Sequence, residues 1–364
     1  MNLLKKFILF SLIILMANVT FAQEEQVVIQ DTPNFNPGEM IMGHVGDEYE
    51  WHICTIGDTH ITVPLLCILY SENSGLHIFS SGNLHHGHAE YEGFKISTSG
   101  EYEGKIVEIV DGKEVRPWDF SITKNVFALL FSVFLISFIF IKMRKYYEKN
   151  VGKAPHGFFN ALELVVLFVR DDIAYASLGK KHGDKFMPFL MTVFFFIFIN
   201  NLLGLVPIFP GGANLTGNIA VTCVLAVMVF IITTINGTKE YWLDIFWPKG
   251  TPIWLKIPPI LPAVEIMGMF TKPIVLMVRL FANITAGHII ALGFYSLIFL
   301  FASNSGIGTA YGVSVPTIIF TVFMSLLELL VAFIQAYVFT LLSSIYFSMA
   351  VAEEHEEAEV KKIA

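Results

Sequence analysis

Residues 258–350 are almost free of charge: in 93 consecutive positions the only Asp, Glu, Lys or Arg side chains are Glu265, Lys272, Arg279 and Glu328. The whole 364-residue chain is 54% hydrophobic and 15% charged, whereas an average soluble domain is roughly 25% charged. The number of polar side chains is too small to cover the surface of a soluble globular protein of this size. We therefore predict an integral membrane protein, with no ordinary soluble enzyme domain in this stretch.

The placement of charge and the missing motifs exclude further classes of protein. The net charge is −8, with acidic side chains gathered after residue 22 and at residues 353–357, which argues against a nucleic-acid partner. The sequence contains no HExxH, GxSxG or GxxxxGK[ST] motif, so neither a zinc hydrolase, a serine hydrolase nor a phosphate-binding loop is indicated. We expect no nucleotide site, no cofactor and no catalysis by this chain alone.

The N-terminal third is predicted to be exported. Residues 1–22 have a basic start at Lys5 and Lys6 and an apolar core too short to span a membrane, followed by small and then acidic residues, which is typical of a secretory signal peptide. Residues 23–120 are polar, with short alternating stretches and turn signals, and predict a small β-rich extracytoplasmic domain. A membrane domain at 121–352 and a cytoplasmic tail at 353–364 complete the chain.

The exported extension is rich in histidine, with seven of the eleven His residues of the chain. The cluster His85, His86 and His88 is a weak candidate for a metal site; a hydrated His-rich loop is the alternative, since no acidic or Cys partner has a fixed spacing to it. Cys54 and Cys67 also lie in this extension, where either one disulfide or two unpaired thiols are compatible with an oxidising compartment.

Apolar stretches predict about five membrane helices. They cover residues 126–141, 187–208, 219–235, 258–302 and 315–350, with an amphipathic interfacial stretch at 156–186 before the second. Basic residues follow the first and third stretches, which places those ends in the cytoplasm. The stretch after residue 235, with Lys239, Lys249 and Lys256, is expected to be a cytoplasmic loop. The Gly- and Ser-rich residues 303–314 are expected to form an external hairpin turn.

The last two stretches are longer than a bilayer needs. We therefore expect an all-α membrane bundle of about five helices, the last two long and strongly tilted, plus the small β-rich N-terminal extracytoplasmic domain. The chain would be a multi-pass protein of the bacterial inner membrane, with the mature N-terminus outside and the C-terminus in the cytoplasm.

Ionisable groups in these apolar helices are costly and usually mark function. At about 100° per residue, Glu265 and Arg279 fall within about 40° of each other. Arg279 and Asn283 share a face, and His288 points roughly the opposite way. Arg279 has no acid within one helical turn, so its partner must come from elsewhere in the fold or from another chain.

The other polar residues of this region have plainer alternatives. Glu328 and Gln335 lie two turns apart on one stripe with Tyr346, which suggests a polar track. Gln335 and Asn283 are alternatively hydrogen-bonding contacts between helices, and Glu265 a satisfied interfacial carboxylate. Lys272, which precedes Pro273, is interpreted as a side chain that reaches the cytoplasmic interface, with a role in the ion pathway as the alternative.

At this point the sequence resembles the a subunit of F-type ATP synthases. The resemblance rests on several motifs in the order found in that family: NLLGLVP at 201–207, PAVE at 262–265 followed by Lys272-Pro273, RLFANITAGH at 279–288, QAYVFT at 335–340 and YFSMA at 346–350. It covers roughly residues 120–355. Some members of the family carry an acid at the position of Gly204. Because this chain has glycine there instead, we assign the position no role in proton entry.

The resemblance implies a stator subunit that conducts protons through two offset half-channels to and from the carboxylates of a rotating c-subunit ring, coupling the proton-motive force to ATP synthesis. Arg279 would face the ring carboxylates. Asn283, His288, Glu328 and Gln335 would line the outer half-channel, and Glu265 would lie toward the cytoplasmic exit. The implied partners are the c-ring, the peripheral-stalk b subunits, the rest of the ATP synthase and the lipid bilayer.

Four questions stay open at this level. An anchored receptor or metal-binding module using His85, His86 and His88 is the main alternative function, and it predicts that Arg279 can be replaced without loss. The choice between H⁺ and Na⁺, the number of c subunits and the role of residues 23–120 are not decided by this sequence.

Overall fold

The computed structural model describes residues 36–351 except 57–58, 88, 99, 111, 207–208 and 248–259. The predicted signal peptide and the C-terminal tail lie outside the described residues, as does His88. Within the described part the chain divides into two compact units. Of the described residues, one unit holds those up to residue 133, 202–215 and 286–329, and the other holds 134–201, 216–285 and those from residue 330 on.

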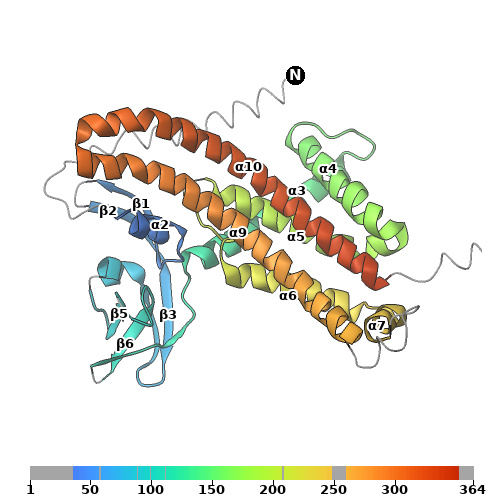
Figure 1. The fold of residues 1–364 in the computed structure, drawn as a ribbon, viewed down its shortest axis with the longest axis horizontal. Helices are drawn as coiled ribbons and strands as arrows, with labels where there is room; N and C mark the ends of the chain where they lie inside the picture. Colours follow the sequence, from blue (N-terminus) through green and yellow to red (C-terminus); the bar gives the residue numbers. More distant parts are fainter. Residues whose placement is uncertain are drawn as a thin grey trace, which may run out of the picture. The chain divides into compact units, whose positions relative to one another are not determined.

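The first unit begins with a short helix and eight strands (Figure 1). They are α2 (Pro37–Val45), β1 (Glu50–Ile56), β2 (Thr59–Pro64), β3 (Leu66–Ser71), β4 (Gly75–Ser80), β5 (Phe94–Ile96), β6 (Ile106–Val110), β7 (Lys113–Val115) and β8 (Trp118–Asp119), with a 3₁₀ helix at Ser81–Gly87. The strands form three small antiparallel sheets, β1-β2, β4-β3-β8 and β5-β6-β7.

The core of this N-terminal part lies between the second and third sheets. Side chains from both, including Leu69, Phe79, Phe94 and Ile106, are almost fully buried, because alternate residues of each strand point to the same face. Cys67 belongs to this core as a free thiol. Burial and, to a lesser degree, the nearby Asp119 raise the pKa of its thiol to about 12, so at neutral pH it is protonated.

The N-terminal part is fastened to the first membrane helix, α3 (Lys124–Lys149). Asp47 accepts hydrogen bonds from the Thr123 hydroxyl at 2.9 Å and from the Asn125 backbone N–H at 3.0 Å. Trp51, only 3% exposed, packs edge-on against Phe127. The strands are therefore held against the start of α3 by polar and aromatic contacts together.

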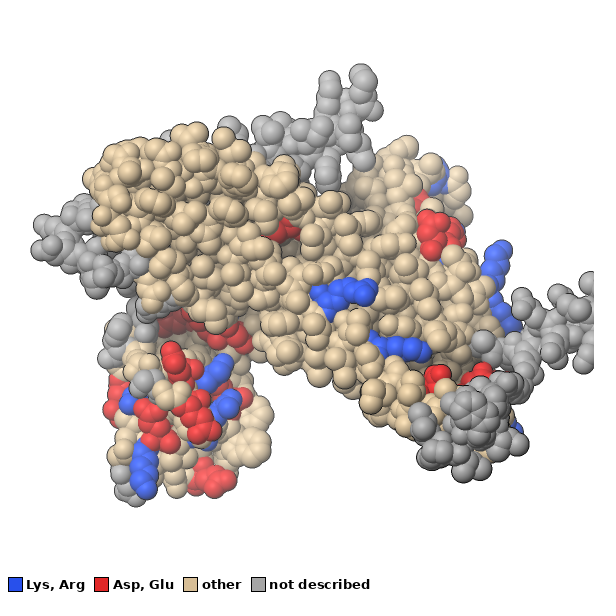
Figure 2. Space-filling view, in the orientation of Figure 1, with Lys and Arg blue, Asp and Glu red and all other residues tan. Residues whose placement is uncertain are grey.

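The remaining helices are long and apolar. They are α4 (Phe158–Phe168), a π-helix (Val169–Tyr175), α5 (Ala176–Gly204), α6 (Ile219–Ile235), α7 (Lys239–Phe246), α9 (Ile260–Ser305) and α10 (Ile307–Val351). Four stretches are long and apolar enough to cross a bilayer, and a fifth if the bent pair α6 and α7 counts as one span. In the visible face of these helices charged side chains are sparse (Figure 2). This confirms the predicted helical membrane bundle.

Two predicted loops contain helix instead. In the Lys-containing stretch after residue 235, Lys239–Phe246 forms α7, which begins because the Thr238 hydroxyl accepts a hydrogen bond from the Tyr241 N–H, the capping contact that starts many helices. The hairpin expected at residues 303–314 is reduced to Gly306, whose positive φ of 85° separates α9 from α10. The helix propensity of single residues is only a weak predictor. Polar, Gly- or Ser-rich stretches therefore become helical where the neighbouring segments form long apolar helices.

Both α9 and α10 are longer than a bilayer needs, as predicted, and α10 is longer than its predicted stretch because it includes most of the expected hairpin. With 46 and 45 residues, each would extend roughly 70 Å at 1.5 Å per residue, against a hydrocarbon core of about 30 Å. Each contains one proline, Pro273 in α9 and Pro316 in α10. Their strong tilt in the membrane remains a prediction.

Candidate functional site

In the first unit the structure brings together His288 of α9 and Glu328 of α10. The His288 Nδ1 and Glu328 Oε1 atoms are 3.1 Å apart, and the side chains are 17% and 12% exposed. A carboxylate so little hydrated is stabilised by a hydrogen-bonding imidazole. The two groups, forty residues apart in sequence, form a pair that can exchange a proton with each other.

Gly287 makes this contact sterically feasible. A Cβ atom built at residue 287 would lie 2.9 Å from Glu328 Oε1 and 3.2 Å from its Cγ, closer than real Cβ contacts. The Glu328 carboxylate therefore occupies the space that any side chain at 287 would fill. The motif AGH in the sequence thus supplies both the imidazole and the gap that admits its partner.

The other edge of the His288 ring faces the end of α5. A Cβ built at Gly204 would lie 3.7 Å from His288 Nε2 and 3.3 Å from the Ala213 carbonyl oxygen. Gly204 therefore borders the nitrogen that Glu328 does not use. Sequence reasoning assigned this position no role; its place beside His288 is a finding of the structure.

In the second unit Arg279 lies on the exposed face of α9. Leu276, Leu280 and Ile284 on the same helix are buried in the core, whereas Arg279 and Asn283 are exposed. The shared face predicted for Arg279 and Asn283 is thus present. Among the residues that the structure describes, Arg279 forms no ion pair, and Glu265, fourteen positions earlier, is also exposed.

Gln335 lies on the buried face of α10 in the second unit. It is 5% exposed, and the buried hydroxyls of Thr340 and Ser343 follow it along the helix. Those hydroxyls donate to carbonyls one turn earlier in α10. Thr340 and Ser343 are thus buried polar groups of α10 beyond the predicted track of Glu328, Gln335 and Tyr346, and the helix itself satisfies them.

A polar contact that sequence reasoning missed involves Asn201 of α5. Its amide Nδ2 donates to the Ala332 carbonyl at 3.1 Å, and its Oδ1 accepts from the Thr216 hydroxyl at 2.6 Å. Asn201 is 3% exposed. The signal in the sequence was the pair Asn200-Asn201 inside an apolar run, since a buried amide must find partners.

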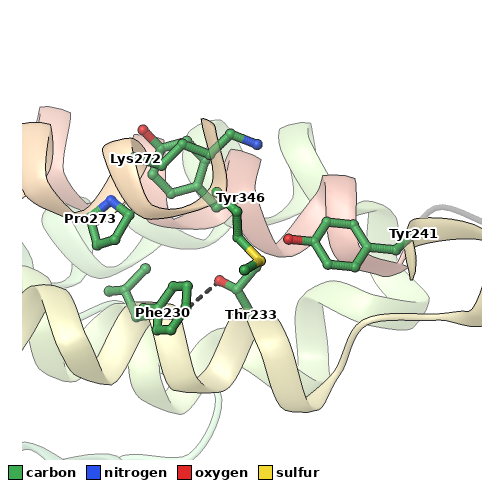
Figure 3. A pocket seen from close by; sticks show the side chains of 8 residues that line it. Phe230, Thr233, Tyr241, Lys272, Pro273 and Tyr346 are labelled. Carbon is green, nitrogen blue, oxygen red and sulfur yellow. Dashed lines mark hydrogen bonds between the residues drawn. The ribbon is translucent and has the colours of Figure 1, made fainter. Parts of the chain in front are cut away.

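Lys272 lies beside a small cavity of the second unit (Figure 3). The cavity is lined by Val229, Phe230, Thr233, Tyr241, Met269, Lys272, Pro273 and Tyr346. The Lys272 ammonium lies 5.6 Å from the centre of the Tyr346 ring and 3.9 Å from the Met349 sulfur. Lys272 thus packs on an aromatic ring and is partly exposed, and its reach to the cytoplasmic interface remains a prediction.

The histidine cluster of the N-terminal part offers little support for a metal site. His85 is exposed, while the side chain of His86 and the whole of His88 lie outside the described residues. No group of three or more His, Cys, Asp or Glu side chains within metal-binding distance occurs in the described part of the chain. In the same part of the chain, His77 Nδ1 lies 2.7 Å from Glu92 Oε2, which is a contact between one histidine and one carboxylate.

Comparison with known proteins gives the family. Residues 126–348 match the family model of the ATP synthase A chain, and residues 40–120 match a domain of unknown function, DUF8433. The chain is 40% identical over 248 residues to an ATP synthase subunit a of Chloroherpeton thalassium, an alignment that covers 66% of this chain and 70% of that protein.

Two further relatives agree with this match. Subunit a of Chlorobium phaeobacteroides is 42% identical over 253 residues, covering 67% of this chain and 70% of the relative. Subunit a of Myxococcus xanthus is 43% identical over 241 residues, covering 65% and 75%. All of the polar residues described above on α5, α9 and α10 lie within the span of the family model. The chain belongs to the ATP synthase subunit a family.

Proposed function

We propose that this chain is the stator subunit that carries protons between the two sides of the membrane and the carboxylates of a rotating c-subunit ring. The observation that carries the proposal is Arg279, an exposed arginine on an apolar helix without an ion pair among the described residues. A guanidinium in such a place needs an anionic partner from another chain.

The chemistry of arginine fits a fixed barrier rather than a carrier. A guanidinium lowers the pKa of an approaching carboxylate and so promotes loss of its proton. It does not itself release a proton, since its pKa stays above about 12. Protons would therefore leave a ring carboxylate near Arg279 without passing through it, and would have to travel around with the ring between two offset half-channels.

The His288–Glu328 pair fits the complementary task of proton entry. Imidazole titrates near neutral pH, and the carboxylate 3.1 Å away can accept or return its proton. We assign this pair, with Asn283 and Gln335, to the outer half-channel and Glu265 to the cytoplasmic exit. One charge moved across 100 mV releases about 2.3 kcal/mol, so several protons per turn supply the energy of ATP synthesis elsewhere in the complex.

The placement in the cell follows the same proposal. We infer an inner-membrane protein with residues 1–22 removed as a signal peptide, residues 23–120 outside and the C-terminal tail in the cytoplasm. The c-ring and the peripheral-stalk b subunits would be its direct partners.

The test is Arg279→Ala in the assembled ATP synthase, reconstituted in vesicles. ATP synthesis driven by an imposed proton gradient is expected to fall to background, because the barrier and the partner of the ring carboxylate are both lost. Arg279→Lys is the matched variant, since it keeps a cation that can lose its proton, and native electrophoresis checks assembly. Unaltered synthesis in an assembled Arg279→Ala complex would overturn the proposal.

A further inference from the structure

The sheet β4-β3-β8 of the first unit has an apolar face that the described residues leave uncovered. Along β3 the residues alternate, with Cys67, Leu69 and Ser71 buried and Leu66 and Tyr70 exposed. The exposed large side chains on this face are Leu66 at 42%, Tyr70 at 47%, Leu76 at 62%, Ile78 at 59%, Trp118 at 64% and Phe120 at 64%.

Strand register makes these side chains neighbours. Tyr70 is paired with Leu76 on one side and with Trp118 on the other, and the Phe120 N–H donates to the Ile68 carbonyl. Paired residues on one sheet face lie about 5 Å apart. The patch is therefore continuous across all three strands, and the residues that form it carry no Asp, Glu, Lys or Arg.

The domain core does not explain this face, because the core uses the opposite one. Cys67, Leu69 and Phe79 pack with Phe94 and Ile106 of the neighbouring sheet, and Figure 1 shows β5 and β6 on only one side of β3. An antiparallel sheet normally presents a polar face to water when one face is buried. A continuous apolar patch in that position marks an interaction surface.

The position of the patch relative to α3 identifies the occupant. The Ile122 N–H donates to the Leu66 carbonyl, so the chain stays hydrogen-bonded to this sheet until two residues before α3 begins at Lys124. Lys124 lies four positions after Phe120 in the chain, a reach of at most about 14 Å. The interfacial layer of a bilayer is itself about 5–8 Å deep on each side.

The attachment to α3 also limits how far the sheet can move away. Asp47 bonds to Thr123 and to the backbone of Asn125, and Trp51 is held by Phe127. A face fixed this close to the start of a membrane helix is within reach of the lipid headgroup layer. Its composition of Trp, Tyr, Phe, Leu and Ile is the composition of protein surfaces at membrane interfaces.

We propose that the face formed by Leu66, Ile68, Tyr70, Leu76, Ile78, Trp118 and Phe120 lies in the lipid headgroup and upper acyl region of the leaflet at which α3 begins. The N-terminal domain is thus a second, peripheral membrane contact of the subunit, beside its spanning helices. This inference depends on the membrane location of α3 and is independent of the proton path.

The experiment is site-directed spin labelling of the full-length subunit in the assembled complex, held in nanodiscs of phosphatidylethanolamine and phosphatidylglycerol. Cys54 and Cys223 are replaced by Ser, Cys67 stays buried, and a nitroxide is placed on Ile78→Cys. Lys113→Cys, exposed on β7 of the other sheet, is the matched control. Oxygen, which concentrates in lipid, is expected to collide with the label at 78 more often than a water-soluble nickel chelate, with the reverse order at 113.

Two other results would overturn the proposal. A label at 78 that prefers the nickel chelate, as at 113, means that the face is in water. A label at 78 shielded from both probes means that a protein segment, a partner subunit or a second copy covers the face.

A second measurement avoids the cysteine substitutions. Brominated lipids are expected to quench a fluorescence component that is lost in Trp118→Phe, and the same quenching in both proteins would count against lipid contact at Trp118.

Discussion

The His288–Glu328 pair and Arg279 lie on the same apolar helix system but handle charge in opposite ways. His288 and Glu328 are largely buried and satisfy each other at 3.1 Å, so their charge can be cancelled by moving one proton. Arg279 is exposed on its helix and has no ion pair among the described residues, and its charge is permanent. On the function proposed above, the pair would be a place where a proton can rest, and Arg279 would be a place that a proton cannot cross.

The largest effect on the paired site is expected from Glu328→Gln. The amide keeps the shape but cannot take a proton from His288, so ATP-driven proton pumping should slow by on the order of tenfold, because a hydrogen bond to a charged group contributes about 1.5–3 kcal/mol and 1.4 kcal/mol changes a rate tenfold. Pumping is measured by acidification of inverted vesicles. Glu328→Asp is the matched variant and should recover part of the rate.

A relay through Glu328 also predicts how the two sites differ. Glu328→Gln should leave residual coupled synthesis, whereas Arg279→Ala should leave none. If both variants lose synthesis equally while the complexes assemble, the distinction between a proton-resting site and a barrier is wrong. An unchanged rate and pH profile in Glu328→Gln would remove Glu328 from the path.

The sequence predicted single helices well where the signals were local. The span at residues 219–235 coincides with α6 (Ile219–Ile235), which starts where the Asn218 side chain accepts a hydrogen bond from the Ala220 N–H. The prediction failed where a polar or Gly- and Ser-rich segment lies directly beside a long apolar helix. The Lys residues after 235 suggested a loop, yet Thr238 caps α7, and the Gly- and Ser-rich hairpin shrinks to Gly306.

Tertiary partners were predictable only in part. Helical periodicity placed Arg279 and Asn283 on one face, and the structure agrees. Periodicity gives the direction of a side chain on its own helix but not what meets it there. Accordingly the 3.1 Å contact between His288 and Glu328, the clearance at Gly287 and the bonds of Asn201 to Ala332 and Thr216 required the fold.

An intermediate effect is expected from Gly287→Ala. Its Cβ would lie 2.9 Å from Glu328 Oε1, so the carboxylate must move away from His288 and proton pumping should fall severalfold, by less than in Glu328→Gln. Gly293→Ala is the matched control on α9, because a Cβ there has no atom within 4 Å. Alanine is the better helix former by about 0.5–1 kcal/mol, so a loss seen only at 287 is steric. Equal rates in the two variants would show that Glu328 does not need this space.

The smallest expected effect, and the sharpest probe of the paired site, is Gly204→Asp. A side chain at 204 starts 3.7 Å from His288 Nε2, the nitrogen that does not contact Glu328. A carboxylate there would bring a second anionic hydrogen-bond partner to the imidazole and compete with Glu328 for it. Proton pumping in inverted vesicles should therefore slow modestly, by less than in Gly287→Ala.

Gly204→Asn is the matched control, because it adds nearly the same volume without the charge. It should reproduce any steric loss but not the loss caused by the charge. An equal loss in both variants would mean that the volume at residue 204, rather than charge beside His288, sets the response. No loss in either variant would place the Nε2 side of His288 outside the rate-limiting path.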